Sequence, residues 1–248
     1  LPRDVVSWVE KDSTLTLQSA AQVYLGGMAR ARDGSLNELG GTFRASQLIT
    51  VDSGVSVDGT GVKLPGTGRM STAQEAGRIV INALGNAGLF GQVVAGGEIV
   101  DMRDSRGTLI GSLPVYKDGD SEIVIRAQGQ ANLGKGLVAG KLIDVLGGTG
   151  SRTATQAEPW LDDGVVLSGD TRLRTFRENS QIKLGATGDV TVMLPAWTYE
   201  VLADGFAEFA KGDLSANASF NMSLNLGSGD VRTGLITISQ SAAANNTD

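Results

Sequence analysis

The sequence contains no cysteine and no histidine among its 248 residues. The lack of cysteine excludes disulfide bonds and thiolate metal sites; it fits a large bacterial surface protein that must cross membranes unfolded, but many cytosolic proteins also lack cysteine. The lack of histidine excludes Ser-His-Asp and Cys-His nucleophilic systems and histidine-ligated metal centres within this chain. Much of ordinary hydrolase chemistry is therefore excluded.

Proline and aromatic residues are also scarce. There are 5 prolines and 5% aromatic residues, whereas glycine occurs 35 times, about twice its usual share. This composition suits a thin core with many tight corners. No stretch approaches the ~20 apolar residues of a membrane span, so we expect no membrane insertion. Because the chain begins at Leu1, we expect a processed product or a part of a longer protein.

Basic residues are too few and too scattered to form a charged run. The net charge is −6. This balance argues against nucleic acid and anionic membranes as partners. At this length the chain buries a substantial core, and we expect one domain over residues 1–240, followed by a flexible tail over 241–248.

An internal repeat dominates the sequence. Residues 77–101 resemble residues 121–144 when one copy is shifted by 44 positions. The coinciding pairs are Ile79 and Ile123, Ile81 and Ile125, Ala83 and Ala127, Gly85 and Gly129, Ala87 and Ala131, Leu89 and Leu133, Val94 and Val138, Ala95 and Ala139, Gly96 and Gly140, and Ile99 and Ile143. A weaker copy occurs at 15–27, where Leu15, Leu17, Val23 and Leu25 take equivalent places. Repetition of this kind decides the architecture before any single residue does.

The repeat alternates with a period of two. From Ile123 to Leu133 every odd position is apolar or small, and the even positions from Arg126 to Asn132 are polar. This pattern predicts extended chain with one buried and one wet face, because such spacing would spread apolar residues around a helix. Glycines between the runs predict short strands joined at corners.

Together these features predict a parallel β-solenoid. A 44-residue unit fits two coils of about 22 residues, so we expect about eleven coils in a rod roughly 50 Å long. The regular repeats occupy 12–144, a lateral insertion occupies 145–163, and less regular coils occupy 164–240.

Several segments outside the repeat have their own expected structure. Residues 58–76 read as a protruding glycine-rich loop that ends in one helical turn at Ser71–Glu75. Arg32-Asp33-Gly34 reads as a turn. One short helix is expected at Trp197–Lys211, although Gly205 weakens it.

The repeat units resemble a known family. The runs L-T-L-Q-S-A-A-Q-V-Y-L-G-G at 15–27 and I-V-I-N-A-L-G-N-A-G-L-F-G-Q-V-V-A-G-G at 79–97 resemble the filamentous haemagglutinins, large exoproteins of bacterial two-partner secretion. The resemblance covers 13–144 well and 164–240 loosely. It implies a right-handed parallel β-helix in an extracellular, elongated, structural or adhesive protein. The chain lacks the family's Asn-Pro-Asn secretion motif, which indicates an interior or C-terminal shaft segment.

Acidic turns are the main candidate sites. Oxygen-rich turns hold Ca²⁺, which needs six to eight oxygen ligands, but none of these turns matches an EF-hand loop or the G-G-x-G-x-D repeat. Solvated turn carboxylates are the alternative and the favoured interpretation, so the expected cofactor is none, with calcium as the weaker alternative. The candidates are Asp101, Asp104, Asp118, Asp120, Asp162 and Asp163.

Aromatic residues beside the repeats are weaker candidates. Trp160, Trp197 and Tyr199 have side chains that stack on sugar rings, although covering a solenoid face is the commoner role. A pair of the acidic residues about 5–10 Å apart in a groove would instead suit a glycosidase. Fold analogy alone does not transfer that activity.

The sequence therefore predicts a non-enzymatic structural or adhesive rod at the bacterial surface or outside the cell. Its expected partners are copies or neighbouring repeats at the coil ends, because an uncapped solenoid end is an open strand edge, and a cell-surface glycan or protein. The alternative is a β-helix that binds or cleaves polysaccharide.

Overall fold

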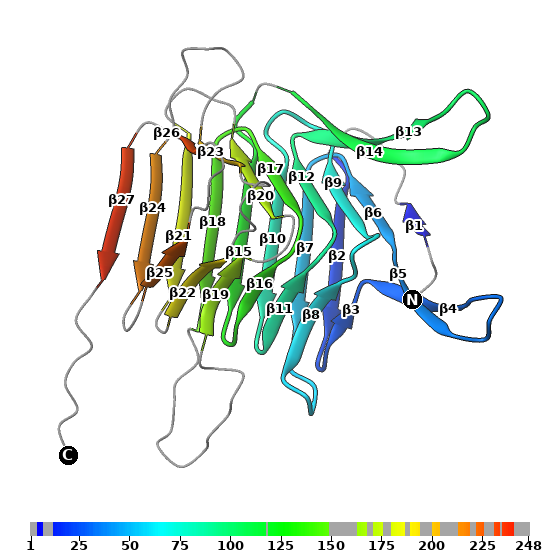
Figure 1. Ribbon diagram of the computed structural model, residues 1–248, viewed down its shortest axis with the longest axis horizontal. Helices are drawn as coiled ribbons and strands as arrows, with labels where there is room; N and C mark the ends of the chain where they lie inside the picture. The colour runs from blue at the N-terminus through cyan, green and yellow to red at the C-terminus, as the bar shows by residue number, and fades with distance from the viewer. Residues whose placement is uncertain are drawn as a thin grey trace.

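The computed structural model describes residues 4–6, 12–117, 119–148, 163–167, 171–175, 180–186, 189–193, 200–203, 213–218, 222–225, 231–233 and 235–240. Within these ranges the elements are all strands, and no helix is present. Most strands belong to three parallel sheets that run the length of the molecule (Figure 1). The chain is a parallel β-solenoid, and the expected all-β class is confirmed.

Each of the first seven coils contributes one strand to each sheet, and the last contributes described strands to sheets A and B. Sheet A contains, in spatial order, β1 (Asp4–Val6), β6 (Thr42–Ala45), β9 (Arg69–Thr72), β12 (Gln92–Ala95), β17 (Gly136–Ala139), β20 (Arg172–Thr175), β23 (Glu200–Ala203) and β26 (Val231–Thr233). Sheet B contains β2 (Thr14–Ser19), β7 (Leu48–Ser53), β10 (Arg78–Ala83), β15 (Glu122–Ala127), β18 (Leu142–Gly147), β21 (Gln181–Ala186), β24 (Asp213–Ala218) and β27 (Leu235–Gln240). Sheet C contains β3 (Val23–Tyr24), β8 (Thr60–Leu64), β11 (Asn86–Leu89), β16 (Ala131–Leu133), β19 (Asp163–Leu167), β22 (Asp189–Met193) and β25 (Met222–Asn225).

Equivalent positions of the sequence repeat pair with each other in neighbouring coils. Ile79 pairs with Ile123 and Ile81 with Ile125 between β10 and β15, and Ala87 pairs with Ala131 between β11 and β16. Identical residues are stacked because each position of a coil meets the same environment in the next one. The weaker copy near the start follows the same rule, since Leu15 pairs with Ile49, which in turn pairs with Ile79.

The prediction that the 44-residue unit forms two coils of about 22 residues is wrong. Strands β10 and β15 are direct neighbours, so the 44-residue shift spans one coil rather than two. The coil is long because an antiparallel hairpin, β13 (Gly97–Arg103) and β14 (Leu109–Tyr116), is inserted after β12. Within the described residues sheets A and B have eight strands each, rather than the eleven expected, which gives a stack of roughly 34 Å at ~4.8 Å per coil.

The core is a set of aliphatic columns that run through the stack. Ile49, Ile79, Ile123, Ile143 and Ile182 follow one another in sheet B, and each is fully buried. β-Branched side chains fit this arrangement because they pack well on a pleated surface. Alternate residues point outward, as the period of two predicts, and this face carries polar residues such as Asp52 and Arg78 as well as apolar ones such as Val80. Burial of these columns is the main source of stability in the coils.

Corners bring backbones together too closely for a side chain. A Cβ on Gly54 would lie 1.8 Å from the carbonyl oxygen of Ala20 in the preceding coil. Gly96 has a φ of +77°, a left-handed conformation that favours glycine. The high glycine content therefore reflects corners that are stacked from coil to coil.

Three local expectations are corrected. Residues 58–76 contain β8 and β9, and Ser71 and Thr72 lie in β9, so neither a long loop nor a helical turn over Ser71–Glu75 forms there. Residues 200–203 form β23 between β20 and β26, whereas a helix was expected. Residues 145–147 belong to β18 rather than to a lateral insertion. In each case ladder pairing with the neighbouring coils outweighs local helix or loop propensity. Residues 197–199 and 204–211 of the expected helix lie outside the described residues. So do residues 149–162 and the expected tail at 241–248.

Two antiparallel hairpins leave the solenoid. The first consists of β4 (Gly26–Arg30) and β5 (Leu36–Gly40), joined by the expected turn at Arg32-Asp33-Gly34, and the second is β13–β14. Figure 1 shows both projecting at the N-terminal end of the stack, beyond β1, β2 and β3. The sequence analysis anticipated neither hairpin.

Candidate binding groove beneath the β13–β14 hairpin

The β13–β14 hairpin is anchored on sheet A by a small apolar contact. Ile99 and Tyr116 pack against Val94 of β12 and Val138 of β17, and both valines are almost fully buried. Residues 97, 99, 101 and 103 alternate with 98, 100 and 102, so Asp101 lies on the same face as Ile99. The anchor therefore turns Asp101, and Ser112 opposite it, toward the solenoid.

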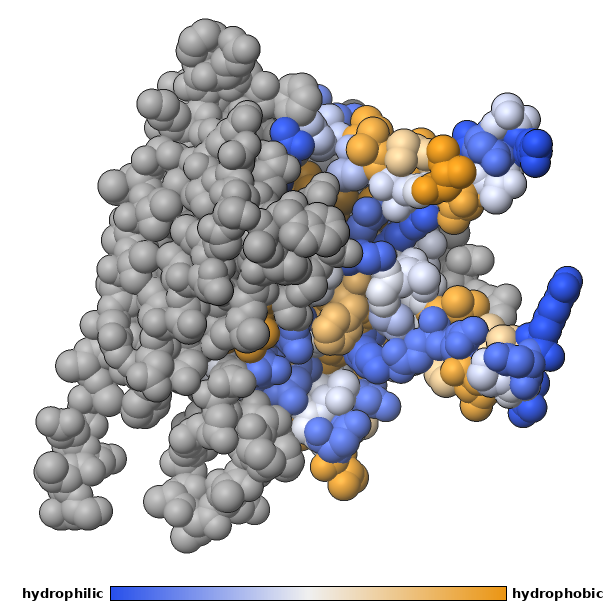
Figure 2. All heavy atoms as spheres, viewed as in Figure 1, coloured by the Kyte–Doolittle hydropathy of each residue, from blue (hydrophilic) through white to orange (hydrophobic). Residues whose placement is uncertain are grey.

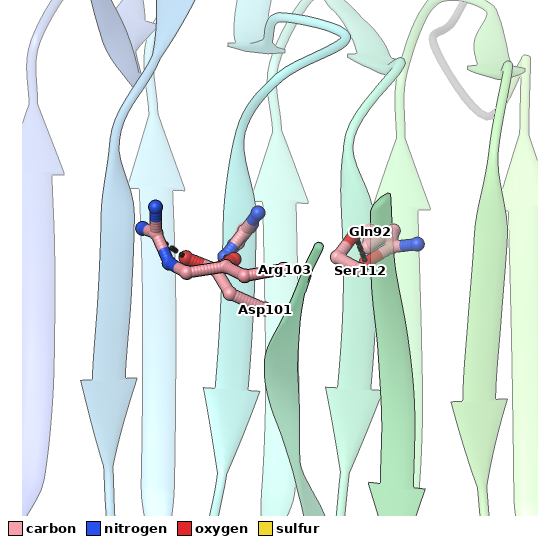
Figure 3. A network of polar contacts seen from close by, with 5 residues as sticks. Gln92, Asp101, Arg103 and Ser112 are labelled. Atoms are coloured by element: carbon pink, nitrogen blue, oxygen red, sulfur yellow. Dashed lines mark hydrogen bonds and ion pairs between the residues drawn. The ribbon is translucent and has the colours of Figure 1, made fainter. Parts of the chain in front are cut away.

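Beside this apolar contact, a network of polar side chains also links the hairpin to sheet A (Figure 3). Asp101 accepts from Arg69 of β9 through one oxygen, and its other oxygen lies 3.4 Å from Nη2 of Arg103. Ser112 Oγ donates to Gln92 Oε1 of β12 at 3.0 Å. The Asp101 carboxylate thus joins the hairpin to sheet A through Arg69, while Arg103 pairs with it from the same strand.

A groove lies between this network and the corner that follows sheet C. Its volume is about 530 Å³, and it is open to solvent. Lys135, at the corner, donates from Nζ to the Gly66 carbonyl oxygen at 2.5 Å. The lining residues are Thr42, Gly66, Thr67, Gly68, Arg69, Gln92, Asp101, Leu109, Ile110, Gly111, Ser112 and Lys135.

The lining suits binding better than acid–base chemistry. It offers two cations, one carboxylate, one amide and three hydroxyl groups, with Leu109 and Ile110 as an apolar lip. Asp101 is the only carboxylate in this lining, and two arginines neutralise it. A glycosidase needs two carboxyl groups about 5–10 Å apart, and the described lining does not supply that pair. Hydroxyl, amide and guanidinium groups do supply hydrogen bonds for a polar or anionic ligand.

The predicted calcium residues have separate roles where they are described. Asp104 caps the hairpin turn, accepting from the backbone N–H groups of Arg106 at 2.9 Å and Thr108 at 2.8 Å. Asp120 is exposed and lies 3.9 Å from Lys141 Nζ. Asp118 and Asp162 lie outside the described residues, and Asp163 begins β19 with its side chain not described. In the part of the chain that is described, no group of three or more acidic residues forms a cation cage, and calcium binding stays a prediction.

The predicted aromatic contacts, Trp160, Trp197 and Tyr199, also lie outside the described residues. The described tyrosines instead pair with cations. Lys63 Nζ lies 5.9 Å from the ring centre of Tyr24, and the Arg174 guanidinium lies 5.8 Å from that of Tyr116. Burial raises the pKa of both tyrosines. For Tyr24 the neighbouring carboxylate of Glu38 raises its pKa further.

Sequence reasoning found one groove residue, Asp101, and missed its partners. Thr42, Arg69 and Gln92 occupy one outward column of sheet A, since Thr42 pairs with Arg69 and Arg69 with Gln92. That column becomes visible in the sequence only once the coil register through β6, β9 and β12 is known. The hairpin that covers it follows from no pattern in the repeat.

Comparison with known proteins yields no relative. No family model, no curated protein and no solved structure matches the chain. Among the described residues no helix is long and apolar enough to span a membrane.

Proposed function

We propose that the chain is a non-enzymatic structural or adhesive segment of a large extracellular bacterial surface or filament protein, acting as a stiff rod. The supporting observation is the continuity of the three parallel ladders around fully buried aliphatic columns. Inter-coil hydrogen bonds lie along the stack, so tension between its ends acts on all three ladders together. A rod of this kind resists extension until a whole coil separates.

The adhesive part of the proposal is supported by the hairpins. They carry most of the large apolar side chains that the described surface exposes, including Leu36 at 58% and Ile110 at 64%. Exposed apolar surface gathered in one region is typical of protein interaction sites. The resemblance of the repeat units to filamentous haemagglutinins is consistent with this role.

Single-molecule pulling tests the rod. The chain is held at both termini and stretched along the stack, and we expect discrete lengthening steps that correspond to the release of coils. The variant Ile123→Ala removes buried packing from two coil interfaces and should lower the unfolding force, whereas the exposed Val100→Ala should not. Smooth extension at low force, with no steps, would refute a load-bearing role.

The groove beneath β13–β14 favours a second candidate function, the binding of polysaccharide. Its hydroxyl, amide and cationic groups match the hydroxyl and carboxylate groups of acidic sugars. A glycan array probed with the labelled chain tests this, and Arg69→Ala with Lys135→Ala should remove the signal. Lys141→Ala is the matched control, because Lys141 is a cation outside the lining. Assays for new reducing ends on any bound polysaccharide separate binding from cleavage.

A further inference from the structure

Among the described residues, the N-terminal end of the solenoid has an open core. Strands β1, β2 and β3 are the last strands of their sheets, so each has one edge without a strand partner among the described residues. Leu15 and Leu17 of β2 are only partly buried, whereas Ile49 and Val51, their neighbours in β7, are fully buried. A hollow of about 520 Å³ opens there between β2 and β3. This end has the geometry of a coil that lacks its neighbour.

Two similar arms project around this open end. The tips of β4–β5 and β13–β14 read R-D-G-S-L at 32–36 and R-D-S-R-G-T-L at 103–109, and an aspartate caps each turn by accepting backbone N–H groups. Each arm also exposes aliphatic side chains, such as Met28 at 53% and Leu109 at 48%. Figure 2 shows hydrophobic surface along both arms and hydrophilic surface at their tips.

Each arm tip carries a net charge of +1, because residues 30–36 and residues 103–109 each contain two arginines and one aspartate. Arg30, Arg32 and Arg106 form no ion pair among the described residues. The neighbouring acidic groups are engaged, since Asp33 and Asp104 cap the turns and Glu38 pairs with Lys63 at 2.7 Å. The tips therefore present available guanidinium groups beside apolar surface, a combination that is enriched in protein interfaces.

The opposite end of the chain has the complementary character. Strands β25, β26 and β27 are the last of sheets C, A and B, so three parallel edges end there within the described residues. Residues 189–248 contain seven acidic residues and two basic ones, a net charge of −5 in a chain of net charge −6. The acidic residues are Asp189, Glu200, Asp204, Glu208, Asp213, Asp230 and Asp248, and the basic residues are Lys211 and Arg232.

We propose that the N-terminal end of this chain docks the C-terminal coils of a second copy, with the two arms holding that copy. The stacking operation would be the one that the molecule already uses between its own coils, because every inter-coil pairing is parallel. A C-terminal edge supplies a strand of the direction that β2 needs, and it covers Leu15 and Leu17. Docking of two N-terminal ends is disfavoured, because it would bring the arginine tips together.

Such a contact is heterologous and does not close. Each copy uses its N-terminal end for one neighbour and its C-terminal end for another, so the product is an open filament rather than a dimer. This inference rests on the proposed rod function and names its partner. The rod function and the docking of copies can fail separately, because pulling tests a single molecule and assembly requires several.

Sedimentation velocity over a range of concentrations tests the docking. We expect the full chain to form species that grow beyond two copies as its concentration rises, and added salt to weaken growth because the contact is partly ionic. The triple variant Arg30→Glu, Arg32→Glu and Arg106→Glu should weaken association by at least tenfold. All three side chains are exposed, and circular dichroism verifies that the variant is folded. Lys183→Glu is the control, because Lys183 is an exposed cation on β21, an inner strand of sheet B far from the arms.

Orientation needs a second measurement. Because the chain lacks cysteine, single thiols at Ser105→Cys and Asn245→Cys accept one donor and one acceptor dye on separate copies. Energy transfer between the arm of one copy and the tail of another supports head-to-tail docking. A chain that remains monomeric at all concentrations, growth that stops at two copies, or an equal loss of association with Lys183→Glu would each overturn the proposal.

Discussion

The coils bury most of their apolar residues, whereas the β13–β14 hairpin leaves most of its own exposed. In the coils the aliphatic side chains face inward, as in β10, where Ile79 and Ile81 are fully buried. In the hairpin the solenoid-facing side carries Asp101 and Ser112 beside the small anchor of Ile99 and Tyr116, and the other face carries Val100, Met102, Leu113 and Val115, which are 42–52% exposed. Both regions show strand alternation, but only the coils use it to build a core.

This difference separates stability from recognition. A coil gains its free energy from apolar burial against two neighbours, so its sequence must repeat the same residue types at the same positions. The hairpin has only a small apolar anchor and a few polar contacts, and its outward face remains available to a partner. The comparison predicts that equivalent changes have large effects on stability in the coils and small effects in the hairpins.

The largest difference is expected for aliphatic truncation. Ile123→Ala should destabilise the fold by about 2–5 kcal/mol, because it leaves a cavity between Ile79 and Ile143 in a column that is closed on both sides. Val100→Ala, with 45% of the residue exposed, should change stability by less than about 0.5 kcal/mol. Urea denaturation followed by circular dichroism measures both. Similar midpoints for the two variants would contradict the distinction between coil and hairpin.

Glycine substitutions should show the same contrast at a smaller scale. Gly54→Ala forces a Cβ against the Ala20 backbone and should cost about 1–3 kcal/mol. Gly27→Ala in β4 meets no atom within 4 Å and should be neutral or stabilise by up to about 1 kcal/mol, since it reduces the entropy of the unfolded chain. Thermal unfolding of the two variants beside the parent chain gives the comparison. A destabilised Gly27→Ala would indicate that the arm is packed more tightly than its open surroundings suggest.

The hairpin anchor gives a weaker and more local effect. Asp101→Asn removes the charge that holds Arg69 and Arg103, and partly exposed ion pairs contribute about 0.2–1 kcal/mol. Amide hydrogen exchange should accelerate in β13 and β14, while exchange in β10 and β15 remains unchanged. Arg78→Gln, which breaks the exposed pair with Glu122 on the coil surface, is the matched control and should leave hairpin exchange unaffected. Faster exchange across all strands would show that the anchor supports the coils as well.

The alternation of the repeat was enough to predict the solenoid. It fixed which side of each strand is buried, and identical residues such as Ile79 and Ile123 do stack. The number of residues per coil could not be read in the same way, because a shift of 44 fits either two short coils or one coil with an insertion. Residues 97–116 are long enough for a hairpin, but Val100, Met102, Leu113 and Val115 imitate core strands while remaining exposed. An alternating apolar pattern predicts a strand, but it does not predict whether the apolar face packs against the core.

The candidate groove was harder to predict for a related reason. Asp101 was singled out as an oxygen ligand in an acidic turn, yet its contacts are cations from β9 and from its own strand. Arg69 lies 32 positions away and meets Asp101 only through the folding back of the hairpin. Lys135 and Gly66 are 69 positions apart and are joined by the stacking of corners. Sites that depend on inserted segments need the insertion geometry, which no repeat encodes.

The smallest expected effect concerns the capped turn of the β4–β5 arm. The Ser35 hydroxyl, which donates to Asp33 Oδ1 at 2.6 Å, lowers the pKa of that carboxyl below its ordinary value, and the Ser35 backbone N–H lowers it further. Because the folded pKa lies below the unfolded one, the cap contributes stability above the ordinary aspartate pKa of 3.8, and the contribution disappears as pH falls through the folded value. Ser35→Ala should therefore raise the Asp33 pKa toward 3.8, as followed by carboxyl NMR titration. Asp58, held by Ser56 at a corner of the coils, gives the comparison, because its own lowered pKa should not respond to a change in the arm. If Ser35→Ala shifted both carboxyls, the turn of the arm and the corner at Asp58 would be coupled, and the cap would not act locally.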